Sequence, residues 1–197
     1  MMAEIYCWDF AMDTPLGTLT VMGANESICG IKHDNPDSKF AQYDESSPSF
    51  KSSTKTLRKQ LLADPKLNVG EPNISVKEEW MTVAVSVKNQ LVKYFLGELL
   101  DFQIPFYDFS GSDLENDVWC EMLSIPYGYT TSYKRIAEAI SRPKSFRPVG
   151  RAVGKNPWSI AIPCHRVIGS NGKLVGYASG LSRKSWLLAH EARVVGS

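Results

Sequence analysis

The chain has 197 residues, of which 43% are hydrophobic and 22% are charged. This composition supports a globular core, and the length allows either one large domain or two small ones. The net charge of +1 indicates no class of partner by itself, but its distribution is uneven. Residues 1–110 carry a net charge of −5 and residues 111–197 carry +6, which hints at a polyanion site in the second half.

The sequence also argues against membrane and secreted classes. No stretch approaches the ~18 apolar residues of a membrane span, and the first residues lack the pattern of a signal peptide. The cysteines Cys7, Cys29, Cys120 and Cys164 form no C-x-x-C pair, which disfavours a disulfide framework or a closed zinc ribbon. We therefore expect an intracellular protein with no membrane partner, in the nucleus of a eukaryote or otherwise in the cytoplasm.

The first part of the chain predicts a small sheet. Residues 5–12 and 19–23 are apolar and β-prone, and Thr14-Pro15-Leu16-Gly17 between them has the chemistry of a hairpin turn. Residues 28–32 are expected to add a third strand.

The next part combines loops and helices. Residues 34–53 are rich in Ser, Asp and Pro and predict a long loop. Residues 54–62 and 83–100 have helical character, the second with apolar residues at three-four spacing. Residues 101–112 contain Pro105 and Gly111 and are interpreted as a linker.

Two short helices with a sharp break between them follow a longer one. Residues 114–123 predict a helix, and Thr131 or Ser132 is expected to cap another at 133–140. Arg142-Pro143 should break that helix before a further helix at 145–153. The pair predicts a helix-turn-helix, although a plain helical hairpin with solvated basic residues has the same pattern.

A strand-like apolar run, residues 160–168, contains Pro163-Cys164-His165. A neighbouring imidazole can take the proton of a thiol, directly or through a water, and so produce a strong nucleophile. Adjacent strand residues point to opposite faces, so Cys164 and His165 can cooperate only if a turn begins here. Glu191, late in a predicted helix, is a candidate to orient His165. The alternative is that Cys164 is an inert core residue and that His165 bonds a carbonyl.

The order and spacing of several motifs resemble those of the O6-alkylguanine-DNA alkyltransferases, also called methylated-DNA–protein-cysteine methyltransferases. The resemblance extends over about residues 112–193, and the N-terminal part matches weakly. It is carried by Ser132-Tyr133, Phe146-Arg147-Pro148-Val149-Gly150, Asn156-Pro157, Pro163-Cys164-His165-Arg166-Val167, Val175-Gly176-Tyr177 and Trp186-Leu187-Leu188-Ala189-His190-Glu191.

The resemblance implies a catalytic group. Cys164 would accept the alkyl group from guanine O6, in one irreversible and stoichiometric transfer. His165 would act as its base through a water, with Glu191 orienting His165. Tyr133 would rotate the nucleotide's phosphate and donate a proton toward the leaving guanine, and Asn156 would be a hinge before the cysteine segment.

The resemblance also implies DNA and substrate contacts. The partner would be double-stranded DNA, approached from the minor groove, with the alkylated nucleotide flipped out. Arg147 would fill the space of the extruded base. The remaining expected DNA contacts are Ser145, Phe146, Arg151 and Tyr133, and the expected guanine pocket consists of Val167, Gly176, Tyr177, Ala178 and Ser179.

The implied fold is a two-domain α+β or α/β protein. Residues 1–108 would form a small mixed α/β scaffold domain of RNase H-like type. Residues 109–197 would form a mostly helical DNA-binding and alkyl-transfer domain with a winged-helix type of helix-turn-helix. We expect a monomer without a cofactor. We also expect no metal, because Cys7, Cys29 and His33 do not match the zinc ligands of some relatives and lack a clear fourth ligand.

Two departures and two rival functions accompany the resemblance. Pro148 stands where relatives usually have a small Ala, so the second helix should begin at 145–146 to keep Pro148 in its first turn. Ala178 replaces a small polar residue.

The rivals are a non-catalytic module that recognises alkylated DNA, which Cys164 disfavours, and a cysteine hydrolase that uses Cys164 and His165.

Overall fold

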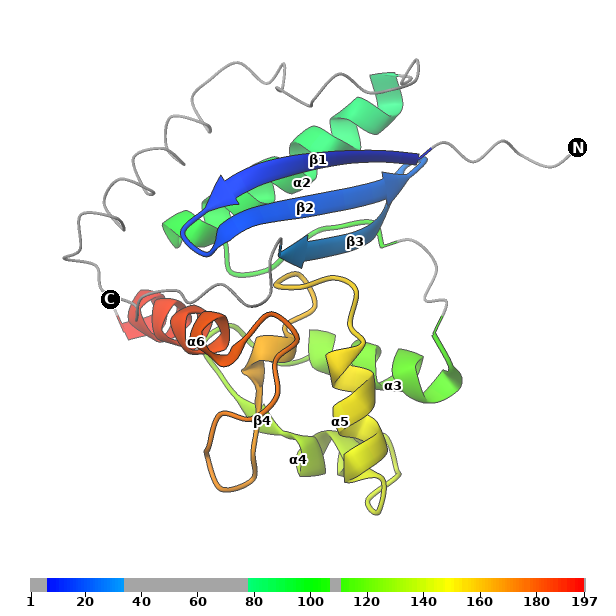
Figure 1. Cartoon of the computed structure of the whole chain (residues 1–197), viewed down its shortest axis with the longest axis vertical. Helices are drawn as coiled ribbons and strands as arrows, with labels where there is room; N and C mark the ends of the chain where they lie inside the picture. Colours follow the sequence, from blue (N-terminus) through cyan, green and yellow to red (C-terminus); the bar gives the residue numbers. More distant parts are fainter. Residues whose placement is uncertain (1–6, 34–77, 107–110, 197) are drawn as a thin grey trace, which may run out of the picture. The chain divides into compact units, whose positions relative to one another are not determined.

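The structure is a computed structural model that describes residues 7–33, 78–106 and 111–196. The described residues belong to two compact units (Figure 1). The first unit contains the strands β1–β3 and the helix α2, and the second contains every element from α3 onward. The architecture is therefore mixed α/β, with a small sheet and several helices. The loop predicted at 34–53 and the helix predicted at 54–62 lie outside the described residues.

The predicted hairpin is confirmed. β1 (Cys7–Thr14) and β2 (Gly17–Ala24) are antiparallel, with Thr14 opposite Gly17. The Thr14 hydroxyl fixes the turn, because it accepts from the Leu16 N–H (3.1 Å) and donates to the Gly17 carbonyl (2.6 Å). Buried and exposed residues alternate along β1, as they must when one face of a sheet covers a core.

The third strand is also confirmed. β3 (Ser27–His33) pairs antiparallel to β2, in the order β1-β2-β3, with an irregularity at Met22/Gly23. Gly23 is required there, because a Cβ would lie 2.1 Å from the Trp8 ring. Part of the predicted linker is bound to the sheet, because the Ile28 N–H of β3 donates to the Pro105 carbonyl (2.8 Å).

The long helix of the first unit is shifted from its prediction. α2 (Glu78–Leu96) begins and ends earlier than the expected 83–100. It ends at Gly97, whose φ is 74°, where the Glu98 N–H donates to Lys93 O and the Gly97 N–H to Tyr94 O. This C-terminal motif stops the helix although apolar residues continue to Leu100. α2 covers one face of the sheet (Figure 1).

The helices predicted in the second half are confirmed. α3 (Asp113–Leu123) is followed by α4 (Tyr133–Ala139), whose cap Ser132 accepts from the Arg135 N–H (3.2 Å). α5 (Phe146–Gly154) packs against both α3 and α4. The break before α5 begins at Ser141, whose φ of 58° reverses the chain just before Arg142-Pro143.

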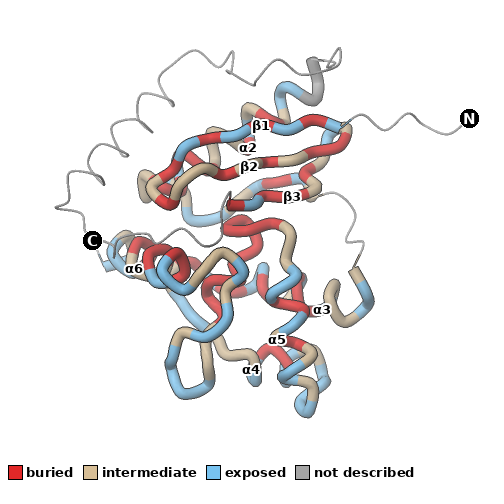
Figure 2. The backbone as a smooth tube through the Cα atoms, in the orientation of Figure 1, coloured by how far each residue is buried: buried red, intermediate tan, exposed pale blue. Residues whose placement is uncertain are grey.

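The strand predicted at 160–168 is mostly wrong. Only β5 (Val167–Ile168) is a strand, and it pairs in parallel with β4 (Thr131–Ser132). The preceding apolar residues turn instead, with a φ of 71° at Ile160, and lead into the 3₁₀ helix η1 (Cys164–Arg166). Residues 158–167 are buried throughout (Figure 2), so the apolar run reflects burial rather than strand periodicity.

The last helix, α6 (Leu181–Gly196), packs against η1 and brings Glu191 to it. Its buried face includes Trp186 and Leu187, as well as the charged residues Lys184 and Glu191. No helix among the described residues has the length and apolar character needed to cross a membrane.

Candidate active site

Cys164 lies at the start of η1, directly after Pro163, where the chain turns. This is the turn that cooperation between Cys164 and His165 requires. The residue is only 8% exposed. Burial raises the pKa of the Cys164 thiol, whereas a hydrogen bond from the Asn156 side chain and the charge of Lys184 act to lower it. The thiol is therefore buried beside polar groups that favour its ionised form.

His165 and Glu191 form the expected buried pair. His165 Nε2 donates to Glu191 Oε1 at 2.7 Å, and both side chains are fully buried. Burial lowers the pKa of His165 despite the opposing effect of Glu191, so the ring is neutral at neutral pH. With its proton at Nε2, the ring keeps the lone pair on Nδ1 free to accept a proton. Nδ1 is buried and bonds to no other described group.

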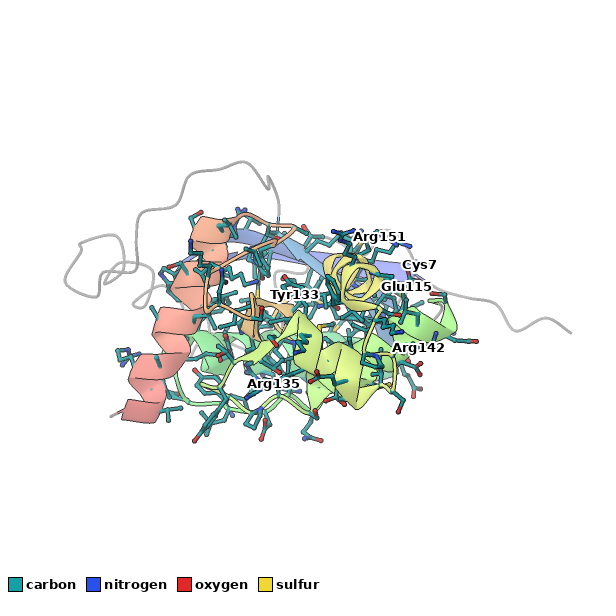
Figure 3. All side chains as sticks on the ribbon, turned by 90° about the horizontal axis from the view of Figure 1, so that it is seen from below. Cys7, Glu115, Tyr133, Arg135, Arg142 and Arg151 are labelled. Atoms are coloured by element: carbon teal, nitrogen blue, oxygen red, sulfur yellow. The ribbon has the colours of Figure 1, made fainter. Side chains whose placement is uncertain are left out.

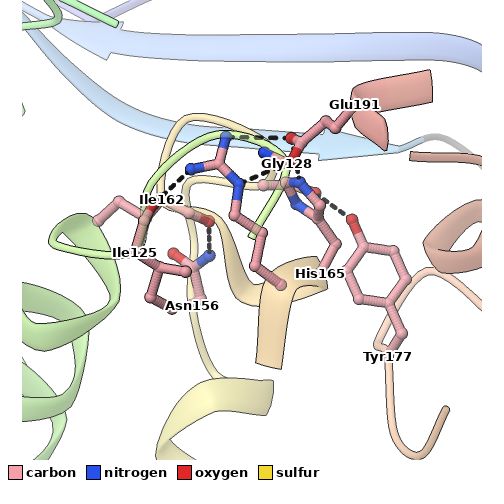
Figure 4. A network of polar contacts seen from close by, with 9 residues as sticks. Ile125, Gly128, Asn156, Ile162, His165, Tyr177 and Glu191 are labelled. Carbon is pink, nitrogen blue, oxygen red and sulfur yellow. Dashed lines mark hydrogen bonds and ion pairs between the residues drawn. The ribbon is translucent and has the colours of Figure 1, made fainter. Parts of the chain in front are cut away.

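Arg166 holds the other side of Glu191. Its Nε donates to Oε2 (2.9 Å) and its Nη2 to Oε1 (3.0 Å), while the Gly128 N–H also donates to Oε2 (3.0 Å). Burial alone would raise the pKa of Glu191, but His165 and Arg166 outweigh it and lower that pKa. The carboxylate stays ionised and fixes the imidazole (Figure 4).

The sequence interpretation gave Arg166 no role, although a signal was present. An arginine in a buried apolar run needs a carboxylate partner. Glu138 and Glu191 are the only acidic residues after Met122, so few partners were available. Arg166 has two further contacts. Its Nη1 donates to the Ile125 carbonyl (2.6 Å), and its guanidinium lies 5.4 Å from the centroid of the Tyr127 ring.

Asn156 lies just beyond α5 and ties that helix to the cysteine segment. Its Nδ2 donates to the Ile162 carbonyl (2.8 Å), and its Oδ1 accepts from the Trp158 N–H (3.0 Å). The same side chain acts to lower the pKa of the Cys164 thiol. Asn156 thus links the end of α5 to the segment before Cys164, and its role as a hinge stays a prediction.

Lys184 is a second buried charge that the sequence interpretation missed. Its Nζ donates to three carbonyls, those of Val167 (2.6 Å), Val175 (2.9 Å) and Gly176 (3.0 Å). Burial lowers the pKa of Lys184 to about 8, an effect that Cys164 opposes. Lys184 therefore links Val175 and Gly176, at the start of the predicted pocket loop, to Val167 of β5, and it places a positive charge near Cys164.

The hydroxyls of Tyr133 and Tyr177, two predicted site residues, both lie within hydrogen-bond distance of a described group. Tyr133 donates to the Val175 carbonyl (2.9 Å), and burial raises its pKa. The Tyr177 hydroxyl lies 3.1 Å from Ser159 Oγ, and burial raises its pKa as well. A smaller contribution from Cys164 also raises the pKa of each tyrosine.

The rest of the predicted pocket is mixed. Val167 is buried, whereas Gly176 and Ala178 are exposed. Gly176 has a φ of 56°, and a Cβ there would lie 3.4 Å from the Tyr133 hydroxyl. Ser179 is half-buried, and its carbonyl accepts from Arg183 (2.8 Å). Lys184 therefore brings Val167 and Gly176 together through their carbonyls, whereas Ala178 is exposed.

The predicted DNA contacts lie on α5 or just before it, except Tyr133, which is half-buried at the start of α4. Ser145 precedes the helix without capping it through its side chain, and Phe146, Arg147 and Arg151 are exposed. Pro148 is the third helical residue, within the first turn as expected. Figure 3 shows this region with Arg151 of α5 and Tyr133 of α4 labelled.

No group of three or more potential metal ligands occurs among residues 7–33, 78–106 and 111–196. Cys7 and Cys29 are free thiols on the sheet.

Comparisons with known proteins give the family. Residues 113–193 match the family described as the DNA-binding domain of 6-O-methylguanine DNA methyltransferase. A methylated-DNA–protein-cysteine methyltransferase of Methanosarcina barkeri is 43% identical over 125 residues, which are 62% of this chain and 78% of the relative. The chain belongs to the methylated-DNA–protein-cysteine methyltransferase family.

A second family member of the same name, from Mycolicibacterium paratuberculosis, is 53% identical over 104 residues. That match spans 53% of this chain and 62% of the relative, so the chain matches less than two thirds of that relative's length. The crystal structure of Mycobacterium tuberculosis OGT in complex with DNA is 32% identical, with a TM-score of 0.67 over 94% of this chain and 93% of that one. Methyltransferase relatives therefore share both the sequence of the second unit and the fold.

Proposed function

We propose that this protein repairs DNA by transferring the alkyl group of O6-alkylguanine to its own Cys164. The observation that carries the proposal is the fully buried Glu191–His165 pair, with His165 directly after Cys164 in η1, in a member of the methylated-DNA–protein-cysteine methyltransferase family. A neutral, oriented imidazole and an ionised carboxylate are the groups that activate a buried thiol.

The transfer forms one bond and breaks one. The Cys164 thiol gives its proton, through a water, to His165 Nδ1, and its sulfur attacks the carbon on guanine O6. The sulfur–carbon bond forms as the carbon–oxygen bond breaks, and the guanine takes up a proton. The charge of Lys184 and the Asn156 amide stabilise the thiolate. Supplying the guanine's proton from Tyr133 requires its hydroxyl to leave the Val175 carbonyl.

DNA binding is assigned to the helix pair α4–α5. Alkylated guanine must leave the duplex before sulfur can reach it. Arg147 is exposed and long enough to take the vacated space, and Arg151 lies one turn further along the helix, where it can meet a phosphate. Ser145, Phe146 and Tyr133 complete this face, with the partner duplex approached from its minor groove.

The finer fold assignments belong to the same proposal. The division of contacts into two units supports a scaffold domain at 1–108 and a DNA-binding, alkyl-transfer domain at 109–197. We assign the first to the RNase H-like type and the second to the winged-helix type, in which the β4–β5 pair accompanies the two helices.

We also propose that each protein molecule reacts only once, and that the protein is an intracellular monomer. The product at Cys164 is a thioether, and none of the groups described around it hydrolyses a carbon–sulfur bond. The site residues supply the nucleophile, base and charge themselves, so the transfer as written needs no metal, nucleotide or methyl donor beyond the lesion. The Val167, Gly176 and Tyr177 positions are assigned to the guanine pocket, with Ala178 and Ser179 at its edge.

The test is the time course of repair of a duplex carrying one O6-methylguanine, at several protein-to-DNA ratios. The repaired DNA should plateau at one equivalent of protein. Binding without repair would identify a recognition module, and continued turnover on an ester or peptide without DNA would identify a hydrolase. Either result would overturn the proposal.

A further inference from the structure

Phe146 is an aromatic residue on α5 that the protein core does not use. It is 50% exposed at the first position of the helix. The other apolar side chains of α5, Val149, Ala152 and Val153, are buried. Half of the Phe146 side chain is accessible to solvent, so the ring is available for a contact with DNA bound at α5.

The helix face of Phe146 leads toward the proposed nucleotide site. Phe146 and Gly150 are four residues apart and therefore lie on one face of α5. Gly150 adjoins Tyr133, because a Cβ on Gly150 would lie 3.7 Å from Cδ1 of the Tyr133 ring. The exposed ring thus stands one turn before the point where α5 meets Tyr133, directly beside Arg147.

An apolar ring next to a cation suits a specific task in duplex DNA. Apolar side chains that enter a base step unstack it, and an aromatic ring restores the lost stacking on one base face. Arginine fills space and meets phosphates, but it replaces base stacking less completely than a ring. The two neighbouring side chains therefore have complementary chemistry for opening one base step.

We propose that Phe146 is a second wedge, which stacks on the base pair beside the flipped nucleotide while Arg147 takes the vacated space. This inference rests on the proposed function and deepens it. Phe146 then lowers the free energy of the extruded state, so it accelerates repair of stacked DNA specifically. It is a positioning residue and touches neither the alkyl carbon nor Cys164.

The experiment compares first-order repair rates at saturating DNA for the full chain and for Phe146→Ala, Phe146→Tyr and Leu123→Ala. Leu123 is an exposed apolar residue of α3 and serves as the matched control. Phe146→Ala should slow duplex repair about tenfold at saturation. The Phe146→Tyr variant should restore the rate, and Leu123→Ala should leave it unchanged.

Two further substrates separate a wedge from a simple contact. The loss of repair rate in Phe146→Ala should be smaller when the lesion lies next to a gap in the duplex, because the gap already unstacks the lesion. The loss of reaction rate with free O6-benzylguanine should be at least several-fold smaller than the loss with duplex DNA. A change confined to DNA affinity, with an unchanged saturated rate, would overturn the wedge. So would equal losses on duplex and free substrate. If the unsubstituted chain repaired no DNA at all, the proposed function itself would fail instead.

Discussion

The interior around Cys164 and the outer face of α5 are built in opposite ways. The interior holds Glu191, Arg166, His165 and Lys184 fully or almost fully buried, each with hydrogen bonds of 2.6–3.0 Å. The face presents side chains such as Arg147 to solvent. The difference indicates that the proposed catalytic groups are already held in place without substrate, whereas the proposed DNA contacts form only when DNA binds.

Glu191→Gln should produce the largest effect, because it leaves Arg166 buried without a full counter-charge. Breaking one side of a buried ion pair costs about 3–5 kcal/mol. We expect the free energy of unfolding, measured by urea denaturation, to fall by that order, and reactions with duplex and free O6-benzylguanine to fall together. The matched variant Glu138→Gln, at an exposed position, should change neither. An unaltered stability of Glu191→Gln would break the account of the interior.

The stabilising effect of Glu191 should also depend on pH. Its pKa is lowered in the folded state, so the unfolded chain binds the proton more readily. The stability difference between the natural chain and Glu191→Gln should be fully present above about pH 4.5 and should diminish as pH falls below it. Denaturation curves between pH 3 and 7 measure this difference. A difference that grew on acidification would contradict the assignment.

Arg147→Ala tests the outer face. Losing the residue that occupies the vacated space should slow duplex repair by about tenfold to a hundredfold, since flipping costs a few kcal/mol. The rate with free O6-benzylguanine should fall much less, because no base has to be extruded. Parallel rate measurements on both substrates give this ratio. Equal losses of rate with the two substrates would show that Arg147 does not act in nucleotide flipping, and would contradict the distinction between the outer face of α5 and the interior.

Lys184→Met should have a smaller effect on both substrates. Removing the ammonium group frees the Val167, Val175 and Gly176 carbonyls and takes a positive charge from beside Cys164. We expect about a tenfold slower alkylation of Cys164, with duplex and free substrate affected alike. The rate of Lys184→Met should need a higher pH to reach its plateau. If only the duplex reaction suffered, Lys184 would belong to DNA recognition instead.

Lys155→Met should have the smallest effect. Lys155 caps α5 and forms an ion pair with Glu115 of α3, at an exposed side chain. The Lys155 side chain is 67% exposed and that of Glu115 is 15% exposed, and an ion pair open to solvent on one side contributes little, so the repair rate should change less than about twofold. The Trp119 Nε1–H bond to the Ala152 carbonyl (2.9 Å) keeps the two helices joined in this variant. A large loss on duplex alone would show that Lys155 contacts DNA directly.

Much of the second unit could be predicted from local signals. The capping serine at 132 and the proline in the first turn of α5 limit where helices begin, and both positions agree with the structure. The end of α2 was mistaken because Gly97 stops the helix while the apolar pattern continues. The segment before Cys164 was mistaken because complete burial makes a turn look like a strand.

The site was predictable where residues adjoin in sequence and less so where they meet through folding. Cys164 and His165 are neighbours, and Glu191 was a candidate because it is a carboxylate late in a predicted helix. The roles of Arg166 and Lys184 depend on backbone carbonyls and a carboxylate brought from distant elements. The sequence pattern around a residue does not show which distant carbonyls will lie near its ammonium group. Those contacts could be found only in the folded structure.

The central claim is tested most directly by locating the transferred group. The protein is incubated with duplex DNA carrying trideuteromethyl on guanine O6, digested, and its cysteine peptides are weighed. The account predicts one trideuteromethyl group on the Cys164 peptide, none on the peptide of exposed Cys120, and none anywhere in Cys164→Ser. Label on another cysteine, or repair that persists in Cys164→Ser, would contradict it.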